Sequence, residues 1–382
     1  MLPKVYFYTT SQEGAPEGAY FQDLLVNLAT GFKQLGIKYY ASNNYWQIHP
    51  DCDRTLIEAT PEVQPTDCDI VVLERQWYEE NGCLPPGLFT PGRRYKTVYF
   101  DCNDGIKTPA WLSEFKQFDF IFKTHYVKHV KYPDNFYPWA FGLSERVLQE
   151  LEERVPWAEK RPSILINFRN KKFNHSVRGY VKKSFIPQIA EIMAIDTSSD
   201  GEAEFPHDHY HYLRWAQTGR RHYPKYFQRL KQSQACACFG GFFLGPQFID
   251  NRDRLAYYFA RLISALGIKT NRLAQWDSWR FWESMAAGCV TLHVDFANYG
   301  FELPVMPENW RHYIGIDLDN IGESINRTTR QPEILQAIAA QGRAWAIKHY
   351  SPLPTAIRFL ETVSSIKSKD LQQLQAEVNS AK

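Results

Sequence analysis

Three side chains that could bind an anion and a sugar lie close together in the stretch WDSWRFWESMAAGCVTLHVD, Trp276 to Asp295. Its pattern predicts a polar turn, an amphipathic helix and a buried strand. Ser278 supplies a hydroxyl, Arg280 a guanidinium and Glu283 a carboxylate, and the last two share a helix face. A helix N-terminus and a nearby arginine suit a diphosphate, and the carboxylate could accept two ribose hydroxyls. The alternative roles are an N-cap for Ser278 and a surface ion pair for the other two.

A basic loop follows another predicted strand, Ser163 to Asn167. Its Arg169 and Lys172 could neutralise a leaving diphosphate, because parallel strands present the loops after them to one ligand-binding edge. The alternative is a solvated basic loop. We therefore count both residues as candidate donor contacts.

An acidic loop, DCNDG, follows the predicted strand Thr97 to Phe100 in the first half of the chain. Asp101 or Asp104 could act as the base that accepts a proton from an attacking hydroxyl. An Asx turn is the structural alternative for this loop. Rival candidates for the base are Glu13, Glu17 and His125, which also follow predicted strands.

Alternating strands and helices are predicted twice along the chain, which indicates two doubly wound α/β domains. The first would span residues 1–145, and 146–162 would be a linker. The second would span 163–350. Residues 351–382 would form a last helix, which could cross back to the first domain, and a polar tail.

The composition limits the classes of partner. The chain has 382 residues and a net charge of +2, from 44 basic and 42 acidic residues. Because this balance offers no basic stripe, we expect no nucleic-acid partner. No apolar run of roughly 18 residues predicts a membrane span, although peripheral membrane contact stays open. Seven cysteines without a framework spacing, and no apolar signal segment, lead us to expect a cytoplasmic protein.

A metal site is not predicted. The seven cysteines include no CxxC pair, and short acidic triplets are weak signals by themselves. The same applies to the histidines near residue 210, which would share a face only if that segment were extended. The residues considered are the triplets at Asp51 and Asp53, Asp67 and Asp69, and Asp317 and Asp319, and the histidines His207, His209 and His211.

The motif around Glu283 resembles that of glycosyltransferases of the two-domain GT-B type, and most closely that of the exostosin-like group. Arg280 to Ser284 and Ala287 to Val290 match the group's pattern, whereas Thr291 stands where a proline is usual. Tyr226 to Ser233 upstream, and Leu303, Pro304 and the Trp310 to Ile316 segment downstream, extend the likeness, which covers roughly residues 220–320.

The resemblance implies transfer of a sugar from a UDP- or GDP-linked donor to a hydroxyl of a glycan or glycolipid. It also implies that the first domain holds the acceptor and that the second binds the nucleotide sugar. It implies donor-ribose contact by Glu283, and transfer that usually inverts the anomeric configuration. No metal or other cofactor is expected to be required, because arginine and the helix N-terminus would neutralise the phosphates. Two alternatives remain: a nucleotide-sugar epimerase of the same fold, and a non-catalytic sugar-binding or scaffold protein.

Overall fold

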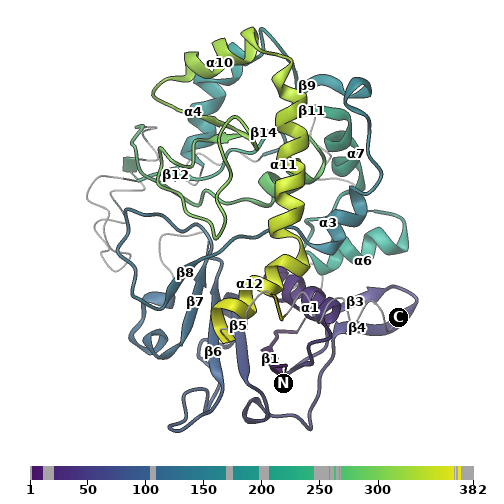
Figure 1. Ribbon diagram of the computed structural model, residues 1–382, viewed down its shortest axis with the longest axis vertical. Helices are drawn as coiled ribbons and strands as arrows, with labels where there is room; N and C mark the ends of the chain where they lie inside the picture. Colours follow the sequence, from purple (N-terminus) through teal and green to yellow (C-terminus); the bar gives the residue numbers. More distant parts are fainter. Residues whose placement is uncertain are drawn as a thin grey trace.

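The computed structural model describes residues 2–11, 21–103, 109–168, 175–197, 206–244, 258, 262–263, 266, 268–364, 366 and 369–370. Two parallel sheets lie one above the other in Figure 1, each with helices packed on it. The lower sheet has six strands in the order β2-β1-β5-β6-β7-β8. They are β1 (Val5–Tyr8), β2 (Tyr39–Ala41), β5 (Ile70–Glu74), β6 (Lys96–Asp101), β7 (Phe120–Lys123) and β8 (Phe136–Pro138).

The upper sheet has five strands in the order β10-β9-β11-β14-β15, and every pairing in it is parallel. Its strands are β9 (Arg161–Leu165), β10 (Ala194–Asp196), β11 (Ser233–Ala237), β14 (Val290–Val294) and β15 (Ile314–Ile316). A short antiparallel pair, β12 (Phe242–Phe243) with β13 (Leu273–Ala274), lies beside this sheet. Two parallel, helix-covered sheets confirm the predicted GT-B architecture.

The helices mostly follow the predicted positions. The first domain has α1 (Asp23–Leu35) and α2 (Arg75–Asn81), and α3 (Glu145–Glu150) follows it. The sequence predicts a helix near Ala110 to Phe115, before β7, but the structure has two short 3-10 turns there, Pro109–Trp111 and Ser113–Gln117. The second domain has α4 (Ser176–Ser184), α5 (Ile186–Ile189), α6 (His209–Gln217), α7 (Pro224–Gln232), α9 (Trp279–Ala286), α10 (Ile321–Arg330) and α11 (Ile334–Tyr350).

The apolar spacing of residues Val181 to Met193 predicts one helix, but the structure divides this region between two. The chain forms α4 and then α5, and Pro187 lies in the first turn of α5. A proline disfavours helical backbone in the residue before it and has no N–H to donate. The apolar periodicity continues through the break, so periodicity alone predicted a single helix.

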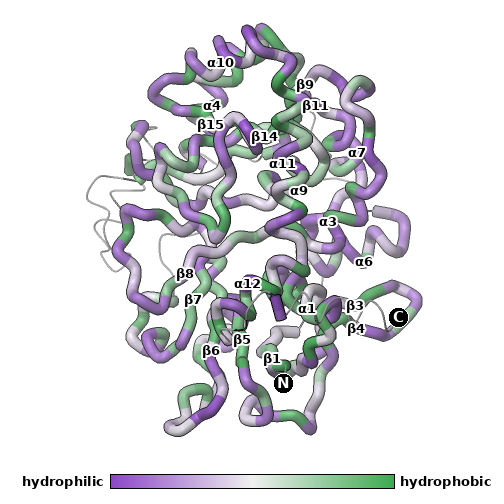
Figure 2. The backbone as a smooth tube through the Cα atoms, viewed as in Figure 1, coloured by the Kyte–Doolittle hydropathy of each residue, from purple (hydrophilic) through white to green (hydrophobic). Residues whose placement is uncertain are grey.

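The last helix, α12 (Pro352–Ser364), returns to the first domain as expected (Figure 1). Its Ala356, Phe359 and Leu360 belong to the same buried cluster as Val5 and Phe7 of β1. Close approach to α1 depends on Gly31, because a Cβ there would collide with the Pro352 carbonyl and with Ala356. Figure 2 shows hydrophobic residues along the inner strands and helices, and hydrophilic ones in peripheral loops.

Hydrogen bonds across the domain boundary join the two domains. The backbone N–H of Phe141 donates to Asp277 Oδ2 over 3.0 Å, and the Trp276 indole donates to the Tyr126 carbonyl over 3.2 Å. A hairpin that the sequence did not predict, β3 (Tyr45–His49) with β4 (Cys52–Ile57), also meets the second domain. Its backbone carbonyls at residues 47 and 48 accept hydrogen bonds from Arg214 of α6, at 3.0 and 2.7 Å.

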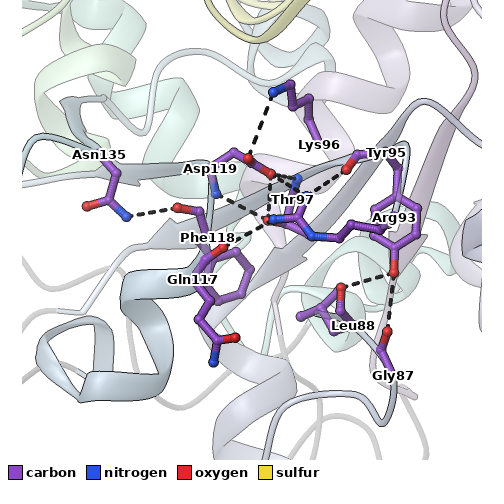
Figure 3. Close-up of polar contacts among 10 residues, drawn as sticks. All are labelled: Gly87, Leu88, Arg93, Tyr95, Lys96, Thr97, Gln117, Phe118, Asp119 and Asn135. Carbon is purple, nitrogen blue, oxygen red and sulfur yellow. Dashed lines mark hydrogen bonds and ion pairs between the residues drawn. The ribbon is translucent and has the colours of Figure 1, made fainter. Parts of the chain in front are cut away.

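A separate polar network closes the amino-terminal end of β6 and β7 (Figure 3). Asp119 Oδ2 accepts from Arg93 Nη1 at 2.7 Å, and from the Thr97 N–H and hydroxyl at 2.7 and 3.0 Å. Burial alone would raise the pKa of Asp119, but these bonds hold it below its usual value. The carboxylate of Asp119 is therefore occupied by hydrogen bonds within the fold.

None of the helices in the described part of the chain is long and apolar enough to span a bilayer.

Candidate functional site

The start of α9 faces the first domain directly. Trp279, the first residue of the helix, packs edge to face against Phe21 with the ring centroids 4.7 Å apart. Its other contacts include Phe141, also from the first half of the chain, at 5.8 Å. The turn that carries Ser278, Arg280 and Glu283 therefore lies at the domain boundary, where a GT-B cleft places its ligands.

Ser278 occupies the N-cap position of α9, but its side chain does not cap the helix. Its backbone is extended, with φ of −148° and ψ of 146°, and no hydrogen bond joins its side chain to the first turn. The hydroxyl oxygen is buried and has no hydrogen-bond partner among the residues that the structure describes. A buried hydroxyl without a partner costs free energy, so this oxygen suits a ligand that supplies one.

Glu283 is 6% exposed and lies in the middle of α9. One oxygen, Oε2, accepts a hydrogen bond from the Tyr226 hydroxyl of α7 at 3.0 Å. The other, Oε1, has no hydrogen-bond partner among the residues that the structure describes. Burial raises the pKa of Glu283, and the nearby charges of Arg146 and Arg280 oppose that rise. Glu283 is thus a fixed carboxylate with one oxygen free for a hydroxyl group.

Arg280 does not form the surface ion pair with Glu283 that was the alternative interpretation. Its charge is close enough to favour the ionised glutamate, yet no ion pair or side-chain hydrogen bond joins it to a described residue. The Arg280 carbonyl accepts a contact from Cys238 Sγ at 3.2 Å, which ties the helix to the end of β11. The guanidinium is left available beside the N-terminus of α9.

Arg146 is a site residue that the sequence did not reveal. It lies in α3, inside the charged segment assigned to the linker, and is 5% exposed. Rings from the two domains, Phe21 and Phe227, each lie 5.9 Å from its guanidinium carbon. Nη1 donates to His222 Nδ1 at 3.0 Å, while Nε is buried without a partner. One arginine in a charged run carries no sequence signal for burial between two domains.

Asp23 is the second residue missed. It lies in the first turn of α1, is 6% exposed, and faces Arg146 and Glu283 electrostatically. Burial raises the pKa of Asp23 to about 7, and the positive charge of Arg146 opposes the rise. A carboxyl group with such a pKa can exchange a proton near neutral pH. In the sequence, Asp23 stands among apolar residues whose spacing indicates a helix, and nothing there marks the aspartate itself as a site residue.

The predicted candidates for the base have different surroundings. Asp101 is fully buried, forms an ion pair with Lys123 at 3.1 Å, and accepts from the Asn103 N–H, as an Asx turn would. His125 Nδ1 accepts from the Asp277 backbone N–H at 3.0 Å, across the domain boundary. The other predicted residues lie outside the described residues: Asp104, Glu13, Glu17, Arg169 and Lys172.

Buried polar atoms without partners occur on both sides of the boundary. On the first domain they are Thr10 Oγ1, Asn27 Oδ1 and Glu74 Oε2, near the carboxyl ends of β1 and β5. Opposite them are the free atoms of Arg146 and Ser278, and the Trp279 Nε1. Native proteins leave few such groups unpaired, so their number here favours a polar ligand at the boundary.

One group of side chains has the spacing of a metal site. His211 Nδ1 and His222 Nε2 are 3.1 Å apart, and Glu150 Oε1 lies 3.5 and 3.6 Å from them. Arg146 always donates, so its bond to His222 Nδ1 puts the ring proton of a neutral imidazole on Nε2. Burial, then Arg146, lowers the pKa of His222 to about 2, so the ring is neutral. A metal needs a lone pair on Nε2, and this arrangement does not fit one.

No protein-family model matches the chain, and no curated protein matches it. Solved structures match it in fold, among them three alpha-glucosyltransferase complexes. The complex with UDP and a 13-mer DNA containing a HMU base has a TM-score of 0.53 at 8% identity, covering 95% of this chain and 100% of that one. The complex with UDP-glucose and DNA containing an abasic site gives 0.52 at 8%, with the same coverage.

The third, with UDP and a 13-mer DNA containing a central A:G mismatch, gives a TM-score of 0.51 at 9% identity, covering 94% of this chain and 99% of that one. At such low identity these matches establish the GT-B fold, and the narrower exostosin-like resemblance stays a likeness of one motif.

The expectation that nucleic acid is not a partner is wrong. Enzymes that share this fold along nearly their whole length are found in complex with DNA. The expectation rested on a net charge of +2, and net charge describes the whole chain. Phosphate contacts need only a local group of basic side chains, so a balanced chain is compatible with a bound duplex.

Proposed function

We propose that this protein transfers a sugar from a nucleoside-diphosphate donor to a hydroxyl group of an acceptor. The observation that carries the proposal is the start of α9. Ser278 Oγ, the Arg280 guanidinium and Glu283 Oε1 all lack a partner in the described part of the chain, and they lie together at the boundary of a GT-B fold. A hydroxyl, a cation and a carboxylate are the groups that a diphosphate and a ribose need.

Each group has a distinct role in the donor complex. Glu283 accepts the ribose hydroxyls, and Tyr226 keeps its carboxylate oriented. Arg280 and the backbone N–H groups at the start of α9 hold the diphosphate and stabilise its charge as it leaves. Arg169 and Lys172, in the loop after β9, join them, because β9 and β11 are parallel neighbours whose carboxyl ends share an edge.

We propose UDP as the nucleotide. Two of the fold-sharing complexes hold UDP and one holds UDP-glucose, which supports this choice over GDP. Because arginine and the helix N-terminus neutralise the phosphates, transfer proceeds without a metal. The acceptor is a molecule with an exposed hydroxyl, and its class is decided by assay among oligosaccharides, glycolipids and DNA with hydroxymethylated bases.

The proposal is tested by turnover. The protein is incubated with UDP-sugars and GDP-sugars and with each acceptor class, and released nucleotide and glycosylated product are both measured, with and without EDTA. We expect acceptor-dependent release of UDP that EDTA leaves unchanged. Epimerised donor formed without acceptor would instead make the chain an epimerase, and nucleotide binding without any product would make it a non-catalytic protein.

A further inference from the structure

Asp23 is a buried carboxyl group with few hydrogen bonds to the described residues. Oδ2 has one long contact, from Asn27 Nδ2 at 3.5 Å, and Oδ1 has no hydrogen-bond partner in the described part of the chain. Asn27 Nδ2 also donates to the Phe141 carbonyl at 3.2 Å, so the amide is only partly committed to the carboxylate. Gln22, just before α1, exchanges two hydrogen bonds with the backbone of Thr10, just after β1, at 3.1 and 3.2 Å. The start of α1, with Asp23, therefore lies near the carboxyl end of β1, at the ligand-binding edge of the first domain.

Three charges from different parts of the chain face one another here: Asp23 of α1, Arg146 of α3 and Glu283 of α9. We call them the boundary charges. The charge of Arg146 opposes the rise in the pKa of both carboxyl groups, both carboxylates raise the pKa of Arg146, and Glu283 raises the pKa of Asp23. Yet no ion pair within 4.0 Å joins any two of these three described side chains. Opposite charges buried together without contact are costly, so something of complementary chemistry is expected among them.

A hydroxyl group has that chemistry. It donates to a carboxylate and accepts from a guanidinium, and so it pairs with both kinds of boundary charge at once. Arg146 Nε is buried with no partner, and neither Asp23 Oδ1 nor Glu283 Oε1 accepts a hydrogen bond from a residue that the structure describes. Glu283 belongs to the donor side, which leaves Asp23 facing the acceptor.

We infer that Asp23 binds the acceptor hydroxyl and takes its proton, and that Arg146 positions Asp23 and Glu283 on either side of the reacting groups. This inference rests on the proposed function. In the step, the acceptor oxygen forms a bond to the anomeric carbon of the donor sugar. The bond from that carbon to the phosphate oxygen breaks, and the nucleoside diphosphate leaves with its electron pair. The proton passes to the Asp23 carboxylate and then to solvent.

Two consequences follow. Attack from the side opposite the leaving diphosphate inverts the anomeric configuration. Transfer also needs ionised Asp23, whose pKa is raised by burial to about 7, so the rate should rise with pH through that region. Among the residues that the structure describes, the charged and titratable groups that face Asp23 are Arg146, Glu283, Glu74 of β5 and Tyr45 of β3.

The test compares Asp23→Asn with Asp69→Asn, an exposed aspartate of the same domain whose carboxylate accepts a hydrogen bond from the Lys4 N–H. We expect Asp23→Asn to bind UDP within about twofold of the unchanged protein and to lose roughly 100-fold or more in kcat, the range for a general base. The rising limb of the plot of rate against pH, near pH 7, should also disappear in Asp23→Asn. Asp69→Asn should keep both the rate and this limb.

The inference fails if Asp23→Asn transfers at the normal rate or keeps the limb. It also fails if NMR of the product of the unchanged protein shows retained configuration, a measurement that needs no variant to fold. Arg146→Lys adds a test of positioning: we expect a fall in kcat with the UDP affinity kept and the limb moved to higher pH, because a shorter, differently shaped cation supports the carboxylate less well. An unchanged protein that binds no nucleotide would refute the proposed function itself.

Discussion

The Tyr226 hydroxyl donates a hydrogen bond to Glu283 Oε2 over 3.0 Å and so joins α7 to α9 at the domain boundary. The tyrosine is itself buried, and burial raises its pKa well above the usual value, so it remains a donor at all ordinary pH. This bond occupies one carboxylate oxygen and fixes the direction of the other. A ligand that meets Glu283 therefore meets a pre-oriented acceptor.

Removing this hydroxyl should weaken donor binding without unfolding the protein. Tyr226→Phe deletes one hydrogen bond to a charged group and keeps the ring in place, which corresponds to about 1.5–3 kcal/mol and roughly a 10-fold or larger rise in Kd for UDP. Calorimetric titration measures it, with Tyr223→Phe, a partly buried tyrosine just before α7, as the control. An unchanged Kd in Tyr226→Phe would remove Tyr226 from the site.

Ser278→Ala separates ligand binding from helix capping. A capping serine contributes about 1 kcal/mol to stability, but the Ser278 hydroxyl makes no cap bond. We therefore expect the free energy of unfolding of Ser278→Ala to change by less than about 0.5 kcal/mol in urea titrations. UDP affinity should fall severalfold. A loss of stability with normal UDP binding would assign this serine to the helix alone.

Asp23→Asn should be more stable than the unchanged protein at alkaline pH. The folded pKa, raised to about 7 by burial, exceeds the ordinary value of 3.8, so ionisation destabilises the fold as pH rises between these values. The difference is on the order of 4 kcal/mol at pH 8 and vanishes below about pH 4. Thermal unfolding at both pH values measures it. Equal melting temperatures at pH 8 would mean that the charge is not buried.

The Asp119 network provides the opposite case (Figure 3). Hydrogen bonds from Arg93 and Thr97 outweigh burial and lower the pKa of Asp119. The stabilising effect of its charge is therefore fully present at a pH above its ordinary pKa near 4, and it is lost as pH falls through the lowered pKa of the folded protein. We expect Asp119→Asn to destabilise the protein by about 1–3 kcal/mol at pH 7 and to leave UDP affinity unchanged. A changed Kd would show that this network reaches the boundary.

The sequence predicted the elements better than the site. Buried apolar runs such as Ile70 to Leu73, and the small-residue turn at Ala286 to Gly288, carry their own local signal, and the strands and α9 followed from them. The hairpin β3–β4 mixes polar and aromatic residues, and its carbonyls at residues 47 and 48 accept hydrogen bonds from Arg214 of the second domain. The periodicity of a short segment contains no information on contacts with residues that are distant in the sequence.

The same reason explains which site residues were missed. Glu283 and Arg280 lie in a recognisable motif, so their place on α9 was predictable. Arg146 and Asp23 become special only when the fold buries them opposite Glu283, which depends on α1, α3 and α9 meeting at one point. Isolated charged residues in a helix are usually solvated, and nothing in their sequence neighbourhood distinguishes these two.

The most direct test of the account is titration of UDP into the unchanged protein, Glu283→Ala and Glu323→Ala. Glu323 is an exposed glutamate on α10 of the same domain and serves as the matched control. We predict that the unchanged protein and Glu323→Ala bind UDP alike, and that Glu283→Ala binds it at least roughly 10-fold more weakly, since a charge-assisted contact is lost. Equal UDP affinity in all three proteins, or no binding by any, would contradict the assignment of the donor site to α9.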